Sequence, residues 1–320
     1  MYKVPVKILG TGAYLPSCLI TSEELEKKLG FSFGEFAKSS GVKTRYYAND
    51  ETSSDMGAIA AKQALNMANL DKSEIDAIVS VSGVPQQSIP SNAALIHRKL
   101  GLKGTVAFDI NSTCLSFLTG FHCMGNLIAQ GVYKRVLLVS SDIASVGLNP
   151  KDSKTASLFG DGAAACILGP ATNEGIISSH FETRSEHGED CICEAGGNLL
   201  HLKDDVPIER HYFRMNGPRL FKAAMPAVLE MIQKMTNEST IDLFIPHQAS
   251  PLALDLLQKK LNISDHQWIN IVRDYGNMIA TSIPFALHKA IMEKKLKRGD
   301  KTLLFGTAAG LTIGGLLLEY

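Results

Sequence analysis

The sequence predicts an α/β protein in which two similar halves stack as a layered αβαβα sandwich. Three observations support this prediction: one pattern occurs twice at a fixed spacing, amphipathic helical segments alternate with short β-rich runs, and one central helix carries few charges until its end. Alternating helices and β-rich runs are typical of α/β proteins, and they predict largely parallel sheets. A pattern repeated at a fixed spacing indicates a duplicated structural unit.

The repeat consists of two pairs of matching segments. EIDAIVSVSG at 74–83 matches TIDLFIPHQA at 240–249, and KRVLLVSSD at 134–142 matches DKTLLFGTA at 300–308. The offset is 166 residues for both pairs. Because two separate segments share one offset, we expect the whole chain to consist of two related halves.

We expect an N-terminal half over residues 1–170 and a C-terminal half over residues 171–320, with the same order of elements in each. An amphipathic helix, identified by apolar residues near the i, i+3, i+4 pattern, precedes a buried strand, and a central helix precedes two closing strands. The expected helices are 55–70 and 220–235, with central helices that start near residues 114 and 279. The expected strands are 77–81, 136–140 and 163–168 in the first half, and 243–245, 302–306 and 312–318 in the second.

Composition favours a cytoplasmic protein that binds neither nucleic acid nor a membrane. Of the 320 residues, 45% are hydrophobic, and the net charge of +0 gives no electrostatic footprint for nucleic acid or anionic lipid. The chain opens without a secretory signal, and the uncharged stretch 302–318 is glycine-rich and short for a bilayer span of ~20 residues. The six cysteines have neither disulfide-framework nor zinc spacing, so we expect reduced thiols, no metal and no cofactor.

Cys114 is the first candidate for catalysis. It lies in FDINSTCLSF, directly after a strand and at the start of a helix whose apolar residues spread around most of its circumference. Such a helix is buried, so its first N–H groups face the interior without partners. We expect these groups to lower the pKa of the Cys114 thiol and to favour the nucleophilic thiolate. The alternative is an inert buried cysteine.

Two further candidates lie in the second half. His247, in LFIPHQAS, ends an apolar strand, and strand ends in open α/β sheets are where ligands bind. Asn277, in DYGNMIATS, precedes the second central helix, where an ordinary N-cap is the alternative. Because Cys114 and Asn277 start equivalent helices, a pseudo-twofold axis would bring all three residues together. A thiolate, an imidazole and an amide then make a nucleophile and two neutral hydrogen-bond donors.

Longer segments add a family resemblance that covers the chain from ILGTGAYLP near its start to GTAAGLTIG near its end. Between them lie GVKTRYYANDETSSDM, the NSTC segment around Cys114, LFGDGAAA, FRMNGPRLF, IPHQA and YGN. Together these segments resemble the beta-ketoacyl-acyl-carrier-protein synthase III family of the thiolase superfamily. The resemblance implies a thiolase-like five-layer fold and a homodimeric enzyme of fatty-acid or specialised-metabolite synthesis.

The resemblance also implies a two-stage Claisen condensation. Cys114 would take an acyl group from a thioester, while the backbone N–H groups of Cys114 and Ala309 hold the oxyanion. His247 and Asn277 would then stabilise the enolate formed when a malonyl thioester on acyl carrier protein loses carbon dioxide. The carbanion would attack acyl-Cys114 and release a 3-oxoacyl thioester, so the protein would be an acyltransferase.

Some positions depart from the family pattern. The tryptophan and arginine that grip coenzyme A correspond to Glu35 and Ser39, and two further arginines correspond to Ser153 and the segment 250–252. These residues cannot supply bidentate contacts to phosphate. We therefore expect the acyl donor to be a carrier-protein thioester or a specialised acyl group, rather than acyl-CoA held in the usual way. Ile89 matches a position that reaches into the acyl tunnel of the partner in the homodimer, and an aliphatic residue there leaves the chain length open.

Several rival functions fit the sequence less well. Hydroxymethylglutaryl-CoA synthases and head-to-head condensing enzymes need a carboxylate from the loop at 80–90, where this chain has no acidic residue. Papain-like proteases share the order Cys, His, Asn, but their cysteine lies near the mature N-terminus. An acyltransferase or a non-decarboxylative condensing enzyme on the same scaffold stays open. A non-catalytic partner subunit also stays open, although the intact Cys114, His247 and Asn277 disfavour it.

Overall fold

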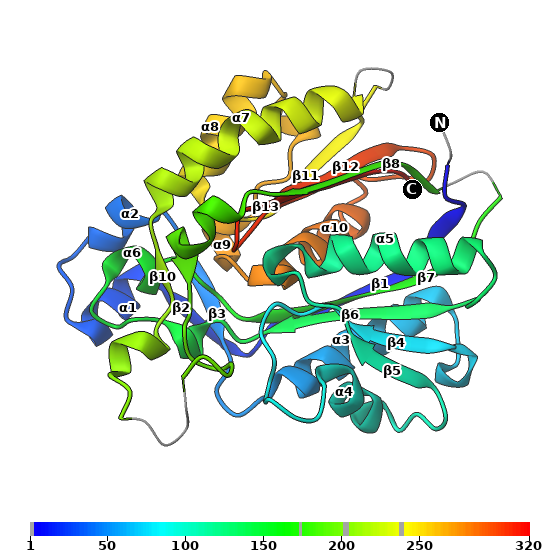
Figure 1. Cartoon of the computed structure of the whole chain (residues 1–320), viewed down its shortest axis with the longest axis horizontal. Helices are drawn as coiled ribbons and strands as arrows, with labels where there is room; N and C mark the ends of the chain where they lie inside the picture. Colours follow the sequence, from blue (N-terminus) through cyan, green and yellow to red (C-terminus); the bar gives the residue numbers. More distant parts are fainter. Residues whose placement is uncertain (1–2, 173–174, 201–204, 237–239) are drawn as a thin grey trace.

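The computed structural model describes residues 3–172, 175–200, 205–236 and 240–320, and it has five layers (Figure 1). Helices α5 and α10 form the middle layer, with one β-sheet on each side of them. Helices α3 and α4 cover the outer face of one sheet, and α7 and α8 cover the outer face of the other. These helices are α3 (Ser53–Ala68), α4 (Asn92–Leu100), α5 (Ser116–Ala129), α7 (Gly217–Thr236), α8 (Pro251–Leu261) and α10 (Ser282–Met292). The predicted αβαβα sandwich is confirmed.

Each sheet draws its strands from one half of the chain. The first has the order β1-β7-β6-β4-β5 and the second has the order β11-β12-β13-β8. We retain the division into residues 1–170 and 171–320 as a proposal that agrees with this separation. The strands of the first sheet are β1 (Val6–Tyr14), β4 (Ala77–Ser80), β5 (Val106–Asp109), β6 (Val136–Asp142) and β7 (Gly162–Pro170). Those of the second are β8 (Gly175–Thr183), β11 (Leu243–Pro246), β12 (Lys301–Ala308) and β13 (Thr312–Glu319).

The expectation of largely parallel sheets is wrong, because both sheets are mixed. Strands β4, β5 and β6 pair in parallel, as do β11 and β12, but β1, β7, β8 and β13 all pair antiparallel with their neighbours. For the pair β12 and β13, the reason is the length of the connection. A tight turn joins β12 to β13, whereas a parallel pair needs a crossover of a dozen or more residues.

The duplication holds at the level of single hydrogen bonds. The backbone N–H of Val81 donates to the carbonyl oxygen of Val139 at 2.8 Å, and the N–H of His247 donates to that of Phe305 at 2.7 Å. Each residue of the second pair lies 166 positions after its counterpart in the first. The two halves therefore end their central parallel strands in the same way.

The central helix α5 is less completely covered than its sequence predicts. Phe117, Phe121 and Met124 are buried in a core cluster that reaches both sheets, but His122 is only half-buried and Cys123 is exposed. A narrow face of this middle-layer helix therefore reaches the surface. In the part of the chain that the structure describes, no helix has the length and hydropathy to cross a membrane.

Smaller elements gather at the end of the sandwich where α5 begins (Figure 1). They enclose that end of the two central helices, where the candidate residues lie. The helices among them are α1 (Ser22–Leu29), α2 (Glu35–Ser39), α6 (Ser153–Ala156) and α9 (Val272–Tyr275). The strands are β2 (Cys18–Thr21), β3 (Thr44–Tyr47), β9 (Cys191–Ile192) and β10 (Arg214–Met215).

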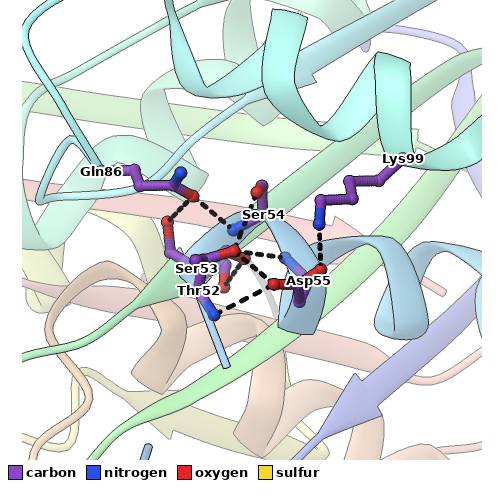
Figure 2. A network of polar contacts seen from close by, with 7 residues as sticks. Thr52, Ser53, Ser54, Asp55, Gln86 and Lys99 are labelled. Atoms are coloured by element: carbon purple, nitrogen blue, oxygen red, sulfur yellow. Dashed lines mark hydrogen bonds and ion pairs between the residues drawn. The ribbon is translucent and has the colours of Figure 1, made fainter. Parts of the chain in front are cut away.

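The start of α3 anchors the loop that follows β4 (Figure 2). Thr52 and Asp55 form a capping box, in which each side chain accepts from the backbone N–H of the other. The side-chain oxygen of Gln86 accepts from the N–H of Ser54 at 3.0 Å, and Lys99 pairs with Asp55 at 2.5 Å. The loop that carries Gln86 is thus fixed to the end of a long helix.

Candidate active site

Cys114, His247 and Asn277 all line one cavity of about 900 Å³. The cavity lies at the end of the sandwich where α5 begins, and both halves of the chain contribute to its wall. Its described lining is mostly apolar and contains no Lys, Arg, Asp or Glu. Such a concave, apolar site with a few convergent polar groups is typical of a small-molecule pocket.

Cys114 lies in a single 3-10 turn (Thr113–Leu115) that leads into α5. Thr113 has a positive φ of 53°, an uncommon conformation for a residue other than glycine. The N–H of Thr113 donates to the side-chain oxygen of Asn111 at 2.8 Å, which compensates for this conformation. The turn thereby presents Cys114 to the cavity.

The turn around Asn277 is built in the same way. It shows that Asn277 is not the counterpart of Cys114, contrary to the expectation from the sequence. Ile279 has a φ of 51°, and its N–H donates to the side-chain oxygen of Asn277 at 2.9 Å. Asn277 is therefore the counterpart of Asn111, while the counterpart of Cys114 is Ala280. The sequence placed Cys114 and Asn277 at equivalent helix starts, but three positions separate them within the repeat.

The Asn277 amide is oriented by its own neighbours. Its Nδ2 donates to the carbonyl oxygen of Ala249 at 3.3 Å, which fixes which end of the amide is the donor. An amide carries two N–H groups, so the second can serve a substrate. The backbone is fixed as well, because Asn277 N–H donates to Leu158 and its carbonyl accepts from Gly160.

His247 directly follows β11 and is 4% exposed. A Cβ atom added to Gly306 of the neighbouring strand would lie 2.4 Å from the Cβ of His247, so only glycine permits this packing. Burial lowers the pKa of His247 to about 4, so the imidazole is neutral at physiological pH. Its Nδ1 is buried without a hydrogen-bond partner among the described residues.

The Cys114 thiol is protonated in the free protein, contrary to the sequence prediction. Burial is the largest effect and raises the pKa of Cys114 to about 12, and the charges of Cys191 and Asp142 raise it further. The backbone N–H groups of Ala309 and Cys114 lower it, but by less. The expected effect of backbone N–H groups is therefore present, and the desolvation of the sulfur outweighs it.

This pKa predicts how Cys114 reacts with iodoacetamide. Only the thiolate is alkylated, so the rate at Cys114 should rise about tenfold per pH unit from about pH 7 to about pH 10 without a plateau. Peptide mapping by mass spectrometry would follow Cys114 alone. The same peptide in urea-unfolded protein should level off above its ordinary pKa of about 8.5. A plateau near that value in the folded protein would contradict the raised pKa.

The N–H groups of Cys114 and Ala309 converge on the sulfur. Ala309 lies in the turn between β12 and β13, so the two donors come from different halves of the chain. An oxyanion formed on a carbonyl carbon bound to this sulfur would lie close to both donors. The geometry suits the oxyanion site that the sequence assigned to them.

Ile89 lies away from the cavity of its own chain. Its side chain is 83% exposed, whereas Gln86, Gln87 and Ser88 of the same loop line the cavity. A single exposed apolar side chain is common on protein surfaces and does not by itself indicate a partner. A position directed to a partner's tunnel agrees with this exposure and stays a prediction.

The positions that depart from the family pattern lie partly together. The Ser39 hydroxyl donates to that of Ser153 at 3.2 Å, which places α2 beside α6. Ser250 caps α8 by accepting from the N–H of Ala253, and Leu252 is exposed. Lys38 is next to Ser39 in the sequence, and Lys154 is next to Ser153. A lysine offers phosphate a point charge and no bidentate pair of N–H donors.

One buried carboxylate beside the site was missed in the sequence. Asp142 ends strand β6, is fully buried, and influences the charge of Cys114. The signal was available, because Asp142 is a charged residue at the end of an otherwise uncharged buried strand. Its counterpart in the repeat is Ala308, so the charge is present in one half alone.

Comparison with known proteins gives consistent matches along the chain. The family model for 3-oxoacyl-[acyl-carrier-protein] synthase III matches residues 108–185, and the model for the C-terminal part of that family matches residues 232–320. A beta-ketoacyl-[acyl-carrier-protein] synthase III of Natranaerobius thermophilus is 35% identical over 98% of this chain and 99% of its own length.

Solved structures agree with these matches. The 3-oxoacyl-[acyl-carrier-protein] synthase III from Aquifex aeolicus has a TM-score of 0.90 at 34% identity and covers 98% of this chain and 100% of its own. The priming beta-ketosynthase from the R1128 polyketide biosynthetic pathway has a TM-score of 0.91 at 25% identity, with 99% and 96% covered. The similarity therefore includes both sheets and the candidate site.

Proposed function

The chain belongs to the 3-oxoacyl-[acyl-carrier-protein] synthase III family and has its thiolase-like fold, and on this basis we propose how its residues carry out the reaction. It is an acyltransferase-class enzyme that condenses an acyl group with malonyl-acyl carrier protein. Cys114 is the nucleophile, His247 and Asn277 stabilise the enolate, and the N–H groups of Cys114 and Ala309 hold the oxyanion. The single observation that best supports these roles is the convergence of all five groups on one uncharged cavity.

The first stage transfers the acyl group to Cys114. The sulfur attacks the thioester carbonyl, and the N–H groups of Cys114 and Ala309 hold the oxyanion that forms. When the intermediate collapses, the bond to the donor's sulfur breaks, and the proton of Cys114 ends on the departing thiol. Because burial raises the pKa of Cys114, little thiolate is present in the free protein at neutral pH, and the sulfur has to lose its proton as it attacks.

The second stage forms the carbon–carbon bond. The malonyl carboxylate leaves as carbon dioxide, and its electron pair becomes an enolate on the thioester carbonyl. Neutral donors suit this charge: the His247 imidazole is uncharged, and Asn277 has an N–H free for substrate. The enolate carbon attacks acyl-Cys114, the Cys114–carbonyl bond breaks, and a 3-oxoacyl thioester is released. The departing Cys114 sulfur takes up one proton from solvent, which restores the thiol. The imidazole must carry its proton on the nitrogen that faces the substrate.

The donor is proposed to be an acyl group on a carrier protein, or a specialised acyl group, rather than acyl-CoA held in the usual way. The described cavity lining has no cation, and positions 39 and 153 are serines whose hydroxyls bond to each other. Arginine forks are the usual partners of phosphates, and their replacement weakens the grip on coenzyme A. The apolar wall favours an uncharged acyl chain.

A second copy of the chain is the proposed partner, and the cytoplasm is the proposed location. Strand β5 lies at the edge of the first sheet, and its Val106 is 46% exposed. An exposed apolar edge strand is a template for pairing with another chain. The loop that carries Ile89 follows β4, the neighbour of β5, so one dimer contact could involve both segments. The six cysteines are free thiols, as a reducing compartment requires.

Intact-protein mass spectrometry tests this function and identifies the donor. The protein would be incubated with a panel of acyl-CoA and acyl-carrier-protein donors, and malonyl-acyl carrier protein would then be added. The expected result is an acyl adduct on Cys114, followed by a 3-oxoacyl carrier protein and one carbon dioxide per turnover. Carrier-protein donors should saturate at lower concentration than acetyl-CoA. Transfer of the acyl group with malonate left intact would indicate an acyltransferase, and saturation by low acetyl-CoA would contradict the proposed donor.

A further inference from the structure

Asp142 is a fully buried carboxylate that binds the loop after β4 and the turn Ile279–Thr281. Its Oδ1 accepts from the N–H groups of Gly83 at 2.8 Å and Val84 at 2.9 Å. Its Oδ2 accepts from the N–H of Thr281 at 3.1 Å and from the Thr281 hydroxyl at 3.0 Å. These donors are uncharged, and burial raises the pKa of Asp142 to about 6, so the site holds an ionised carboxylate at neutral pH despite desolvation.

The Oδ1 side of this carboxylate leads to the nucleophile. The carbonyl of Gly83 accepts from Nδ2 of Asn111 at 3.3 Å, and Asn111 accepts the N–H of Thr113, which precedes Cys114. A Cβ atom added to Gly83 would lie 3.3 Å from the carbonyl oxygen of Thr113. The position of Gly83 therefore bears directly on the turn that presents Cys114.

The Oδ2 side leads to the amide that binds substrate. Thr281 closes the 3-10 turn Ile279–Thr281, and its N–H also lies 3.0 Å from the carbonyl oxygen of Met278. The first residue of this turn, Ile279, donates its N–H to the side-chain oxygen of Asn277. Fixing Thr281 therefore fixes the turn that orients the Asn277 amide.

The repeat shows that the fold alone does not need this carboxylate. Ala308 takes the equivalent place at the end of β12, so the second half makes the same strand end without a charge. The start of α3 and Asn92 hold Gln86 further along the loop (Figure 2), whereas the N–H groups of Gly83 and Val84 both donate to Asp142. A buried charge held in one half alone, beside the reacting groups, is typical of a functional site.

We propose that Asp142 is a positioning residue that sets the Cys114 turn and the Asn277 turn relative to each other. It acts through Gly83 on the nucleophile and through Thr281 on the enolate-binding amide. This role rests on the proposed functions of Cys114 and Asn277. Displacing a reacting group by about 1 Å can cost on the order of 10²-fold in rate, so both stages of the reaction should depend on Asp142.

The test measures the two stages separately in Asp142→Asn and Thr281→Val. Acylation is followed as the mass adduct on Cys114, and decarboxylation as carbon dioxide released from malonyl-acyl carrier protein. Both rates are expressed per active site, counted from the final adduct, so that unfolded protein does not contribute. Asp142→Asn should slow both stages by on the order of 10²-fold. Thr281→Val keeps the carboxylate and removes one hydroxyl, so it should slow decarboxylation more than acylation.

Glu26→Gln is the matched control. Glu26 is also buried, and its carboxylate accepts from the N–H groups of Gly34 at 2.9 Å and Phe36 at 2.6 Å. These bonds lie outside the two turns, and Glu26 does not line the described cavity, so the variant should lose thermal stability but keep both rates per active site. Equal rates in Asp142→Asn and wild type, or equal losses in Asp142→Asn and Glu26→Gln, would overturn the proposal.

If Asp142→Asn does not fold, Thr281→Val alone tests the positioning role of Asp142. Equal slowing of both stages in Thr281→Val, or none, would overturn the proposal, since the hydroxyl lies on the Asn277 side. A wild-type protein that forms no 3-oxoacyl product would instead overturn the proposed function. The wild-type assay is therefore run first.

Discussion

Replacing Cys114 by alanine is expected to abolish acyl transfer and condensation while leaving decarboxylation of malonyl-acyl carrier protein in place. In the proposed mechanism the Cys114 sulfur carries the acyl group, and removal of a catalytic nucleophile costs a factor on the order of 10⁴ to 10⁶. His247 and Asn277 remain in the cavity of Cys114→Ala, so the malonyl group can still lose carbon dioxide. The product is then acetyl-acyl carrier protein, because the enolate has no acyl group to attack and takes up a proton.

Cys123→Ala provides the matched comparison. Cys123 lies on the same helix, α5, but is exposed outside the cavity, so its loss should change neither the adduct nor the product. Intact mass and gas-phase carbon dioxide detection distinguish the two variants. An acyl adduct that survives in Cys114→Ala would assign the nucleophile to another thiol, and Cys191 in the cavity wall would be the first to examine.

The repeat explains why so much of the fold could be predicted. Matching segments at one offset defined two halves, and the hydrophobic pattern located the central helices and buried strands. The direction of the strands could not be predicted in this way. Hydrophobic periodicity indicates which face of a strand is buried, but not whether the neighbouring strand runs parallel or antiparallel to it. The antiparallel pairing of β7 with β1 and β6 depends on how distant segments of the chain pack together, which no local pattern reports.

The positions of the three candidate residues could also be predicted, but their electrostatics could not. Cys114 lies beside backbone N–H groups, as expected, yet burial of its sulfur raises the pKa to about 12. The sequence predicted a buried helix start, but whether desolvation of the sulfur outweighs the N–H groups depends on the whole cavity wall. The role of Asp142 was missed for a related reason. It depends on hydrogen bonds to Gly83 and Thr281, which lie far from Asp142 in the sequence.

Replacing His247 by alanine is expected to slow condensation by about 10² to 10³-fold while Cys114 still becomes fully acylated. In the proposed mechanism the neutral imidazole donates to the enolate, whereas acyl transfer to the sulfur uses the N–H groups of Cys114 and Ala309. Burial lowers the pKa of His247 to about 4, so above about pH 5 the imidazole is neutral and has one N–H to donate. Titration of His247 should therefore leave condensation in the wild type unchanged between about pH 5 and about pH 9.

His122→Ala is the control for this variant, because it removes a histidine whose pKa is also lowered by burial but which lies outside the cavity. His122 packs against Phe181 with ring centroids 5.6 Å apart, so its loss should affect stability rather than the rate per active site. The decisive quantity is the ratio of the two half-reaction rates in His247→Ala. A selective loss of condensation assigns His247 to the enolate. An equal loss of acylation would instead assign it to removal of the Cys114 proton, which a thiol with so high a pKa makes the most direct competing role.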